Sequence, residues 1–194
     1  MEAQRCDDAP VWLIDTDKQG TLSLWHDRRE EETPQRAELP FSRLDAGLKA
    51  LAERGAAYCF VDTAPTISDQ NTSLLRLADL VLIPVRPSPA DLWAVSETVK
   101  LVKEIGQPFL FVITQAKPQA TITAQTIAAL SEHGQVAQTF IADRVSYAVA
   151  MTGGKTAPEL QPKGPAAEEI KGLWQNILSC FHENMNSTRR TSHG

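Results

Sequence analysis

The sequence predicts an α/β protein with a mainly parallel sheet and helices on both faces. Short, almost continuously apolar runs lie at residues 11–14, 58–61, 80–83 and 109–113, and residues 138–141 offer a shorter fifth candidate. Such runs are typical of strands that are covered on both faces. Longer helical patterns separate them, and strands that alternate with helices build right-handed βαβ units.

The helices are predicted from their end signals. Ser42 and Ser88 each stand three residues before an aspartate, which is the capping-box pattern, and Pro89 suits a first helical position. Glycines follow the apolar stripes where helices commonly end. The predicted helices lie at residues 42–55, 88–106, 123–133 and from residue 165 onwards.

Length and charge limit the class of protein. The chain has 194 residues, which suffices for one well-buried domain, and a net charge of -5 at pH 7. This charge argues against a strongly basic nucleic-acid binder that works as a monomer, although a small basic patch remains compatible with it. We predict one domain at residues 1–183 and a polar, disordered tail at residues 184–194.

Compartment signals favour the cytoplasm. Cys6, Cys59 and Cys180 are far apart and lack metal-ligand spacing, which predicts reduced thiols. No apolar run reaches the length of a membrane span, and the first ten residues have no signal-peptide pattern. We therefore expect a cytoplasmic protein without a membrane partner.

Carboxylates follow two of the predicted strands. Asp15 and Asp17 come after the first strand, and Asp62 ends the second. Ligands of open α/β sheets bind at the carboxyl ends of the strands, where such carboxylates can serve a metal ion and a water molecule. The plainer interpretation is that Asp15 caps the strand end while Asp17 is a solvated loop charge. Residue types alone favour that interpretation.

Several segments together resemble one family. Residues 12–23 look like the D-x-D-P-Q-G-S/T segment, called switch I, of the ParA family of partitioning ATPases, in the MinD/ParA group of deviant P-loop proteins. Residues 60–65 resemble the Walker B segment of that family, and residues 78–85 and 87–92 resemble the strand and turn that follow it. The run from residue 144 to 174 is also similar, so the likeness extends from residue 11 to about 181.

The resemblance implies a deviant P-loop NTPase fold, with ATP and Mg²⁺ as cofactors. It implies that Asp17 activates the attacking water and that Asp15 and Asp62 serve the magnesium ion. It further implies an ATP-dependent homodimer that binds DNA without sequence preference, a centromere-binding partner protein, and a role in plasmid or chromosome partitioning. The implied nucleotide-binding positions are Gln19, Gly20, Thr63 and Pro65.

Two departures from the family pattern stand out. Lys18 takes the place of the usual proline, and no K-G-G-x-G-K-T-T loop is found before the first strand. That loop supplies backbone N–H groups and lysines to the phosphates, through charge-assisted hydrogen bonds of roughly 1.5–3 kcal/mol each. We therefore expect a fold without its first strand–P-loop–helix unit, and a chain that is inactive as an ATPase. Translation of the DNA upstream of Met1 would test whether the chain is a fragment.

One segment imitates the missing loop. Residues 152–156 read T-G-G-K-T, but Val149 stands where a P-loop needs its first glycine. We interpret this segment as a turn.

Two alternatives remain open at this stage. The first is a non-enzymatic module of the same descent that binds DNA or a partner protein. The second is a receiver-like or flavodoxin-like domain in which Asp62 accepts a phosphoryl group. The second alternative leaves the likeness around Gln19, Gly20, Ser88 and Pro89 unexplained.

Overall fold

The computed structural model describes residues 1–7, 10–64 and 68–191. It confirms the predicted α/β class with parallel strands and helices. Contacts within the chain group into two compact units. Residues 1–77 and 145–162 form unit 1, and residues 78–144 and 163–194 form unit 2.

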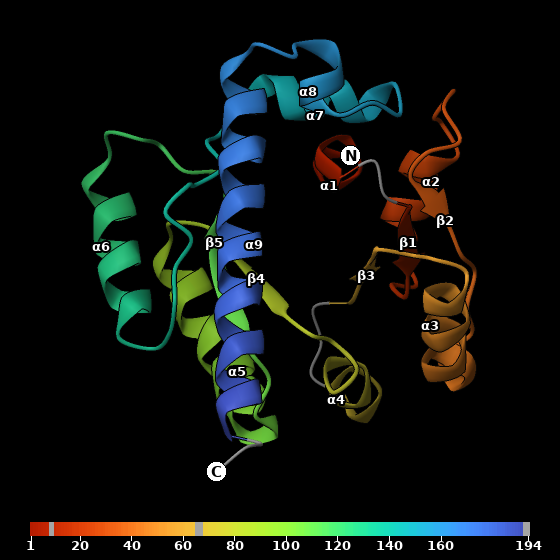
Figure 1. The fold of residues 1–194 in the computed structure, drawn as a ribbon. Helices are drawn as coiled ribbons and strands as arrows, with labels where there is room; N and C mark the ends of the chain where they lie inside the picture. The colour runs from red at the N-terminus through yellow and green to blue at the C-terminus, as the bar shows by residue number, and fades with distance from the viewer. Residues whose placement is uncertain (8–9, 65–67, 192–194) are drawn as a thin grey trace. The chain divides into compact units, whose positions relative to one another are not determined.

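Unit 1 is built on a three-stranded parallel sheet with the order β2-β1-β3 (Figure 1). Strand β1 (Val11–Asp15) and strand β3 (Tyr58–Asp62) are the first two predicted strands, and they pair in register from Val11↔Tyr58 to Asp15↔Asp62. Strand β2 (Gln35–Arg36) was not predicted, because its two residues lie in a charged, proline-bearing segment.

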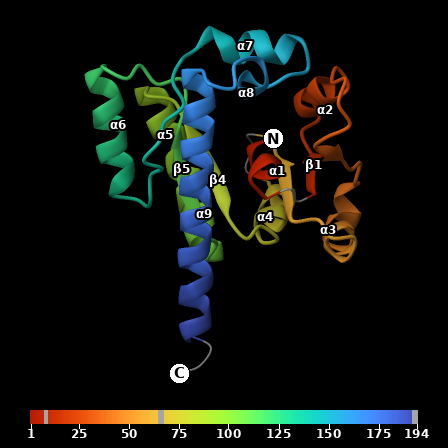
Figure 2. The ribbon, with the colours of Figure 1, turned by 45° about the horizontal axis from the view of Figure 1, so that its top comes forward.

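Helix α3 (Leu44–Glu53) and helix α4 (Asp69–Leu75) contribute to the core of unit 1. The predicted capping box at Ser42 is wrong: the 3₁₀ turn η1 (Phe41–Arg43) precedes α3, and no side chain caps the helix. The core side chains are Ile14, Leu44, Leu51 and Leu74. The other helices of unit 1 are α1 (Glu2–Asp7), α2 (Thr21–His26), α7 (Val145–Thr152) and α8 (Ala157–Leu160), of which α7 and α8 contact each other (Figure 2).

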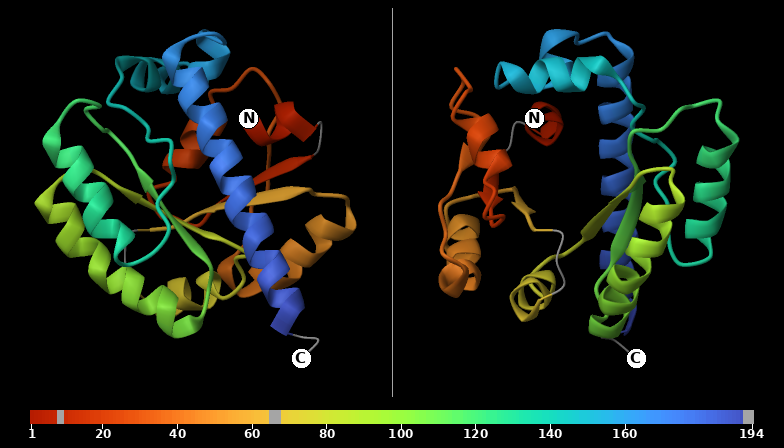
Figure 3. Two further views of the ribbon diagram at one scale, coloured as in Figure 1. Left: turned by 60° about the vertical axis from the view of Figure 1, so that its left-hand side comes forward. Right: turned by 180° about the vertical axis from the view of Figure 1, so that it is seen from behind.

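Unit 2 contains the parallel pair β4 (Val81–Val85) and β5 (Phe109–Ile113). Helix α5 (Pro89–Ile105) and helix α9 (Pro165–Thr191) lie on opposite faces of this pair (Figure 3). Helix α6 (Thr121–Ser131) begins two residues before its predicted start. The predicted fifth strand at residues 138–141 does not form. Isolated parallel bridges lie on either side of it and pair Phe111 with Val136 and Ala116 with Ala142.

Helix α9 continues to Thr191 and so enters the segment 184–194, for which the sequence predicts a disordered tail. No helix among the described residues is long and apolar enough to cross a bilayer.

The Ser88 cap of helix α5 provides a direct test of the helix-end argument. The Ser88 hydroxyl accepts a hydrogen bond from the Asp91 backbone N–H at 3.3 Å, as the capping pattern predicts. We expect Ser88→Ala to lower the free energy of unfolding by about 1 kcal/mol. Urea denaturation measures this loss, and Ser96→Ala on the exposed face of the same helix is the matched control. Equal unfolding free energies for the two variants would contradict the assignment.

Candidate functional site

The carboxyl ends of β1 and β3 bring the predicted acidic residues together in unit 1. Asp15 and Asp62 are direct partners across the two parallel strands. The next residue, Thr16, binds this edge twice, because its backbone N–H and its hydroxyl both donate to the Asp62 carbonyl oxygen, at 2.9 and 2.7 Å. Two strand ends and the loop that follows β1 therefore meet at one place.

The loop between β1 and α2 is ordered by hydrogen bonds to carboxylates. Asp15 Oδ1 accepts from the Asp17 N–H at 3.1 Å, and Asp15 Oδ2 accepts from the Ser23 N–H at 2.8 Å. Asp17 Oδ1 accepts from the Gln19 N–H at 3.0 Å, and the Asp17 carbonyl accepts from Gly20. Gly20 closes the turn with φ 64°, in the left-handed region that favours glycine.

Negative charge accumulates at this edge. The pKa of Asp62 is raised by partial burial and by the negative charges of Asp15 and Asp17, while a hydrogen bond from the Thr63 backbone opposes the rise. A cation would relieve this repulsion, and Mg²⁺ prefers carboxylate oxygens, so the residues fit a magnesium ion in charge and chemistry. In the described part of the chain, however, no three His, Cys, Asp or Glu side chains are grouped to hold one metal ion.

Most of the residues singled out from the sequence lie at this edge. Asp15, Asp17 and Asp62 share it, and Thr63 follows Asp62 directly. The loop that carries Asp17 also contains Gln19 and Gly20. Pro65 lies outside the described residues.

Sequence reasoning missed a buried ion pair in unit 1. The two terminal guanidinium nitrogens of Arg29 contact Glu159, at 2.8 and 3.2 Å, and the Arg29 side chain is only 1% exposed. Arg29 also donates to the carbonyl oxygens of Gly154 and Thr33, and it lies 4.8 Å from the centre of the Trp25 ring. No local pattern signals this pair, because its two members are 130 positions apart in the chain.

The P-loop imitation at residues 152–156 is a turn, as predicted. Helix α7 ends at Thr152, and Thr156 caps α8 in a capping box with Glu159. Gly154 has φ 65°, and a Cβ atom there would lie 2.5 Å from the carbonyl group of Arg28. A side chain at position 154 would therefore clash with the backbone of Arg28, which explains why glycine stands there.

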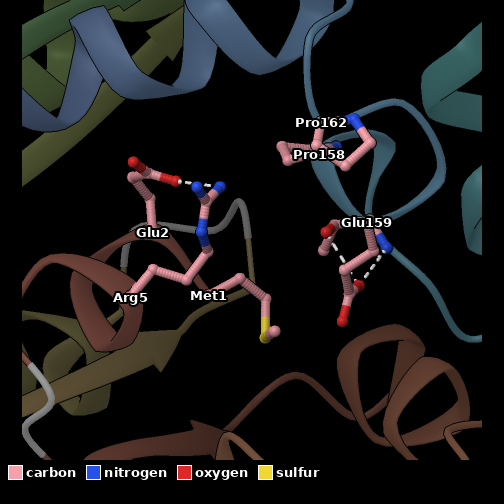
Figure 4. Close-up of a pocket in the computed structure, with 7 residues that line it drawn as sticks. Met1, Glu2, Arg5, Pro158, Glu159 and Pro162 are labelled. Carbon is pink, nitrogen blue, oxygen red and sulfur yellow. Dashed lines mark hydrogen bonds and ion pairs between the residues drawn. The ribbon is translucent and has the colours of Figure 1, made fainter.

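A pocket of about 320 Å³ lies between α1 and the α8 region of unit 1 (Figure 4). None of the predicted site residues lines it. Within it, Arg5 pairs with Glu2 at 3.1 Å, and Glu159 bonds to Thr156. Its lining residues are Met1, Glu2, Arg5, Thr156, Pro158, Glu159 and Pro162.

A curated protein matches this chain over most of its length. The chain is 28% identical over 178 residues to maintenance of carboxysome distribution protein A of Halothiobacillus neapolitanus, and the match covers 87% of this chain and 82% of that protein. No family model matches the sequence.

Solved structures match over most of the chain. An ATP complex of McdA from Cyanothece has a TM-score of 0.72 at 17% identity, covering 91% of this chain and 88% of that one. The MinD cell division protein of Aquifex aeolicus has a TM-score of 0.71 at 14% identity, covering 92% and 87%. A plasmid partition protein of Borrelia burgdorferi bound to AMPPNP has a TM-score of 0.67 at 13% identity, covering 92% and 90%. The resemblance seen in the sequence is therefore confirmed, and this chain has the fold of the MinD/ParA ATPases.

Proposed function

We propose that the chain is a ParA-type ATPase that positions or partitions a large cellular cargo. The observation that carries this proposal is the meeting of Asp15, Asp17 and Asp62 at the carboxyl ends of two neighbouring parallel strands. Nucleotides bind at this edge in open α/β sheets, and the accumulated negative charge favours a divalent cation. The fold favours this function over a receiver-like domain.

Each residue has a role in the proposal. Asp62 would hold Mg²⁺ and Asp15 would support that site, while Asp17 would position the water that attacks the terminal phosphate. When bound, Mg²⁺ neutralises charge on the phosphate oxygens. Asp17 Oδ1 is held by the Gln19 N–H, which leaves Oδ2 as the oxygen to accept a proton from that water. Gln19, Gly20, Thr63 and Pro65 complete the proposed nucleotide contacts.

The proposed cargo and partners follow the related proteins. One similar protein is named for carboxysome distribution and another for plasmid partition. We therefore propose that the cargo is as large as a carboxysome or a DNA molecule, that is, a plasmid or a chromosome. We further propose an ATP-dependent homodimer, DNA binding without sequence preference, and a cargo-bound partner protein that stimulates hydrolysis. For a plasmid cargo, that partner would be a centromere-binding protein.

The test is ATP hydrolysis with magnesium, measured on the printed chain and on the longest in-frame product of its gene. We expect the printed chain, in which no P-loop is found, to be inactive. Hydrolysis by a longer product that supplies this loop should fall at least tenfold in Asp17→Asn, because the attacking water loses its acceptor. Asp45→Asn is the matched control, since Asp45 is an exposed aspartate of unit 1 paired with Lys49. Equal rates in wild type and Asp17→Asn would refute the proposed role of Asp17.

A non-enzymatic module of the same descent is the second candidate. It is favoured by two observations. Both Asp15 oxygens accept backbone hydrogen bonds, and no three-ligand metal group is found among the described residues. This candidate predicts binding to DNA or to a partner protein without detectable ATP hydrolysis in either protein sample.

A further inference from the structure

Both carboxylate oxygens of Asp15 accept hydrogen bonds from the backbone. Oδ1 accepts from the Asp17 N–H and Oδ2 accepts from the Ser23 N–H, at 3.1 and 2.8 Å. Asp17 lies near the start of the loop that connects β1 to α2, and Ser23 lies in the first turn of α2. The Asp15 side chain therefore spans this loop from its first residues to the first turn of the helix.

The start of α2 explains why this contact is needed. The first amides of a helix have no partner within the helix, and a side chain at the N-cap position commonly serves the third of them. Here Gly20 is the N-cap, it has no side chain, and Ser23 is the third helical residue. Asp15 supplies the missing acceptor from the end of β1, and its negative charge is favourable at a helix N-terminus.

Asp15 itself is held in place by the sheet. It is the last residue of the central strand and the ladder partner of Asp62, and Thr16 is bound to the Asp62 carbonyl oxygen. Asp17, by contrast, lies in the loop, where it is half-buried. Besides the bonds from its neighbour Thr16 to Asp62, the hydrogen bond from the Asp17 N–H to Asp15 ties Asp17 to the sheet.

We propose that Asp15 is a positioning residue, a remote helix cap that fixes the loop carrying Asp17 to β1 and α2. Its importance for hydrolysis rests on the proposed function. This role of Asp15 rests on its two backbone hydrogen bonds and needs no contact between Asp15 and Mg²⁺.

The test needs neither nucleotide nor metal. Amide hydrogen exchange of the full chain is measured by NMR in the wild type, Asp15→Ala and Asp15→Asn. We expect the Ser23 and Asp17 amides to exchange about tenfold to a hundredfold faster in Asp15→Ala. Asparagine keeps one acceptor oxygen, so Asp15→Asn should restore protection of one of the two amides. The amides of Ala37 and Ala57, which donate to the carbonyl oxygens of Leu13 and Pro10 at 2.9 Å each, report whether the strands stay paired.

The side-chain conformation of Asp17 shows whether Asp15 positions this residue or only stabilises the fold. Three-bond couplings report the χ1 angle of Asp17, which should be fixed in the wild type and averaged in Asp15→Ala. The control Asp45→Asn should leave both the couplings and the exchange rates unchanged. Unchanged Ser23 exchange and a fixed Asp17 rotamer in Asp15→Ala would overturn the proposal. If the sheet amides of Asp15→Ala also exchange fast, the variant is unfolded. The amide exchange and the Asp17 couplings of Asp15→Asn then test the proposal instead.

Hydrolysis assays keep the two proposals apart. If the wild type hydrolyses ATP, Asp15→Asn should lower kcat with little change in KM, since it disturbs the placement of Asp17. If no protein sample hydrolyses ATP, the proposed function fails, and the amide and coupling data still decide the role of Asp15.

Discussion

Arg29→Met should lower the free energy of unfolding by about 3–5 kcal/mol, because it leaves the Glu159 carboxylate without its partner in a largely buried site. Arg29 also supplies hydrogen bonds to Gly154 and Thr33, whose carbonyl oxygens would lose their donor. Methionine keeps much of the apolar volume, so the loss reports the charge and its hydrogen bonds. Urea denaturation followed by fluorescence provides the measurement.

Two controls test whether the loss in Arg29→Met comes from breaking a buried ion pair. Lys49→Met removes an ion pair of similar length, 2.8 Å, whose side chains are 71% and 57% exposed, and it should cost less than about 1 kcal/mol. The double variant Arg29→Met, Glu159→Met should recover part of the loss, since no unpaired charge remains. Similar losses for Arg29→Met and Lys49→Met would contradict the buried arrangement.

Acid should destabilise unit 1 through Glu159. Burial raises the pKa of Glu159, but hydrogen bonds from Arg29 and Thr156 outweigh burial and lower it from 4.5 to about 2. The carboxylate is therefore favoured in the folded state, and its contribution is fully present above the unfolded pKa. The contribution falls away as the pH drops from about 5 towards 2, and it amounts to about 2–3 kcal/mol.

The unfolding free energy measured at several pH values checks this expectation. Glu159→Gln should be less stable than the wild type at pH 7. The difference should shrink progressively below pH 4.5, because the unfolded wild type then takes up a proton at Glu159 while the folded protein keeps the carboxylate charged. Acidic residues elsewhere contribute equally to both proteins and cancel in the difference. A constant difference between pH 7 and pH 3 would show that Glu159 does not titrate with a lowered pKa.

The predicted strands were largely correct because their signal is local. Residues 11–14, 58–61, 80–83 and 109–113 are continuous apolar runs, and each forms a strand of nearly the predicted extent. The Ser88 cap is also local, since Ser88 and Asp91 are three residues apart. Parallel strands align their carboxyl ends, so the sequence also predicted that Asp15 and Asp62 would meet.

Features that depend on distant partners could not be predicted in this way. Strand β2 has only two residues, and its pairing with β1 defines it. Ser42 has the capping pattern, yet the chain enters α3 through a 3₁₀ turn and leaves that pattern unused.

The sequence by itself determined the strand ends and the acidic residues that stand at them, because both are properties of neighbouring positions. Only the tertiary structure decided what each carboxylate does. Asp15 caps a helix eight residues away, and Glu159 holds an arginine 130 residues away. Hydrogen bonds and ion pairs depend on distance in space, and only the folded chain brings these groups within reach of one another.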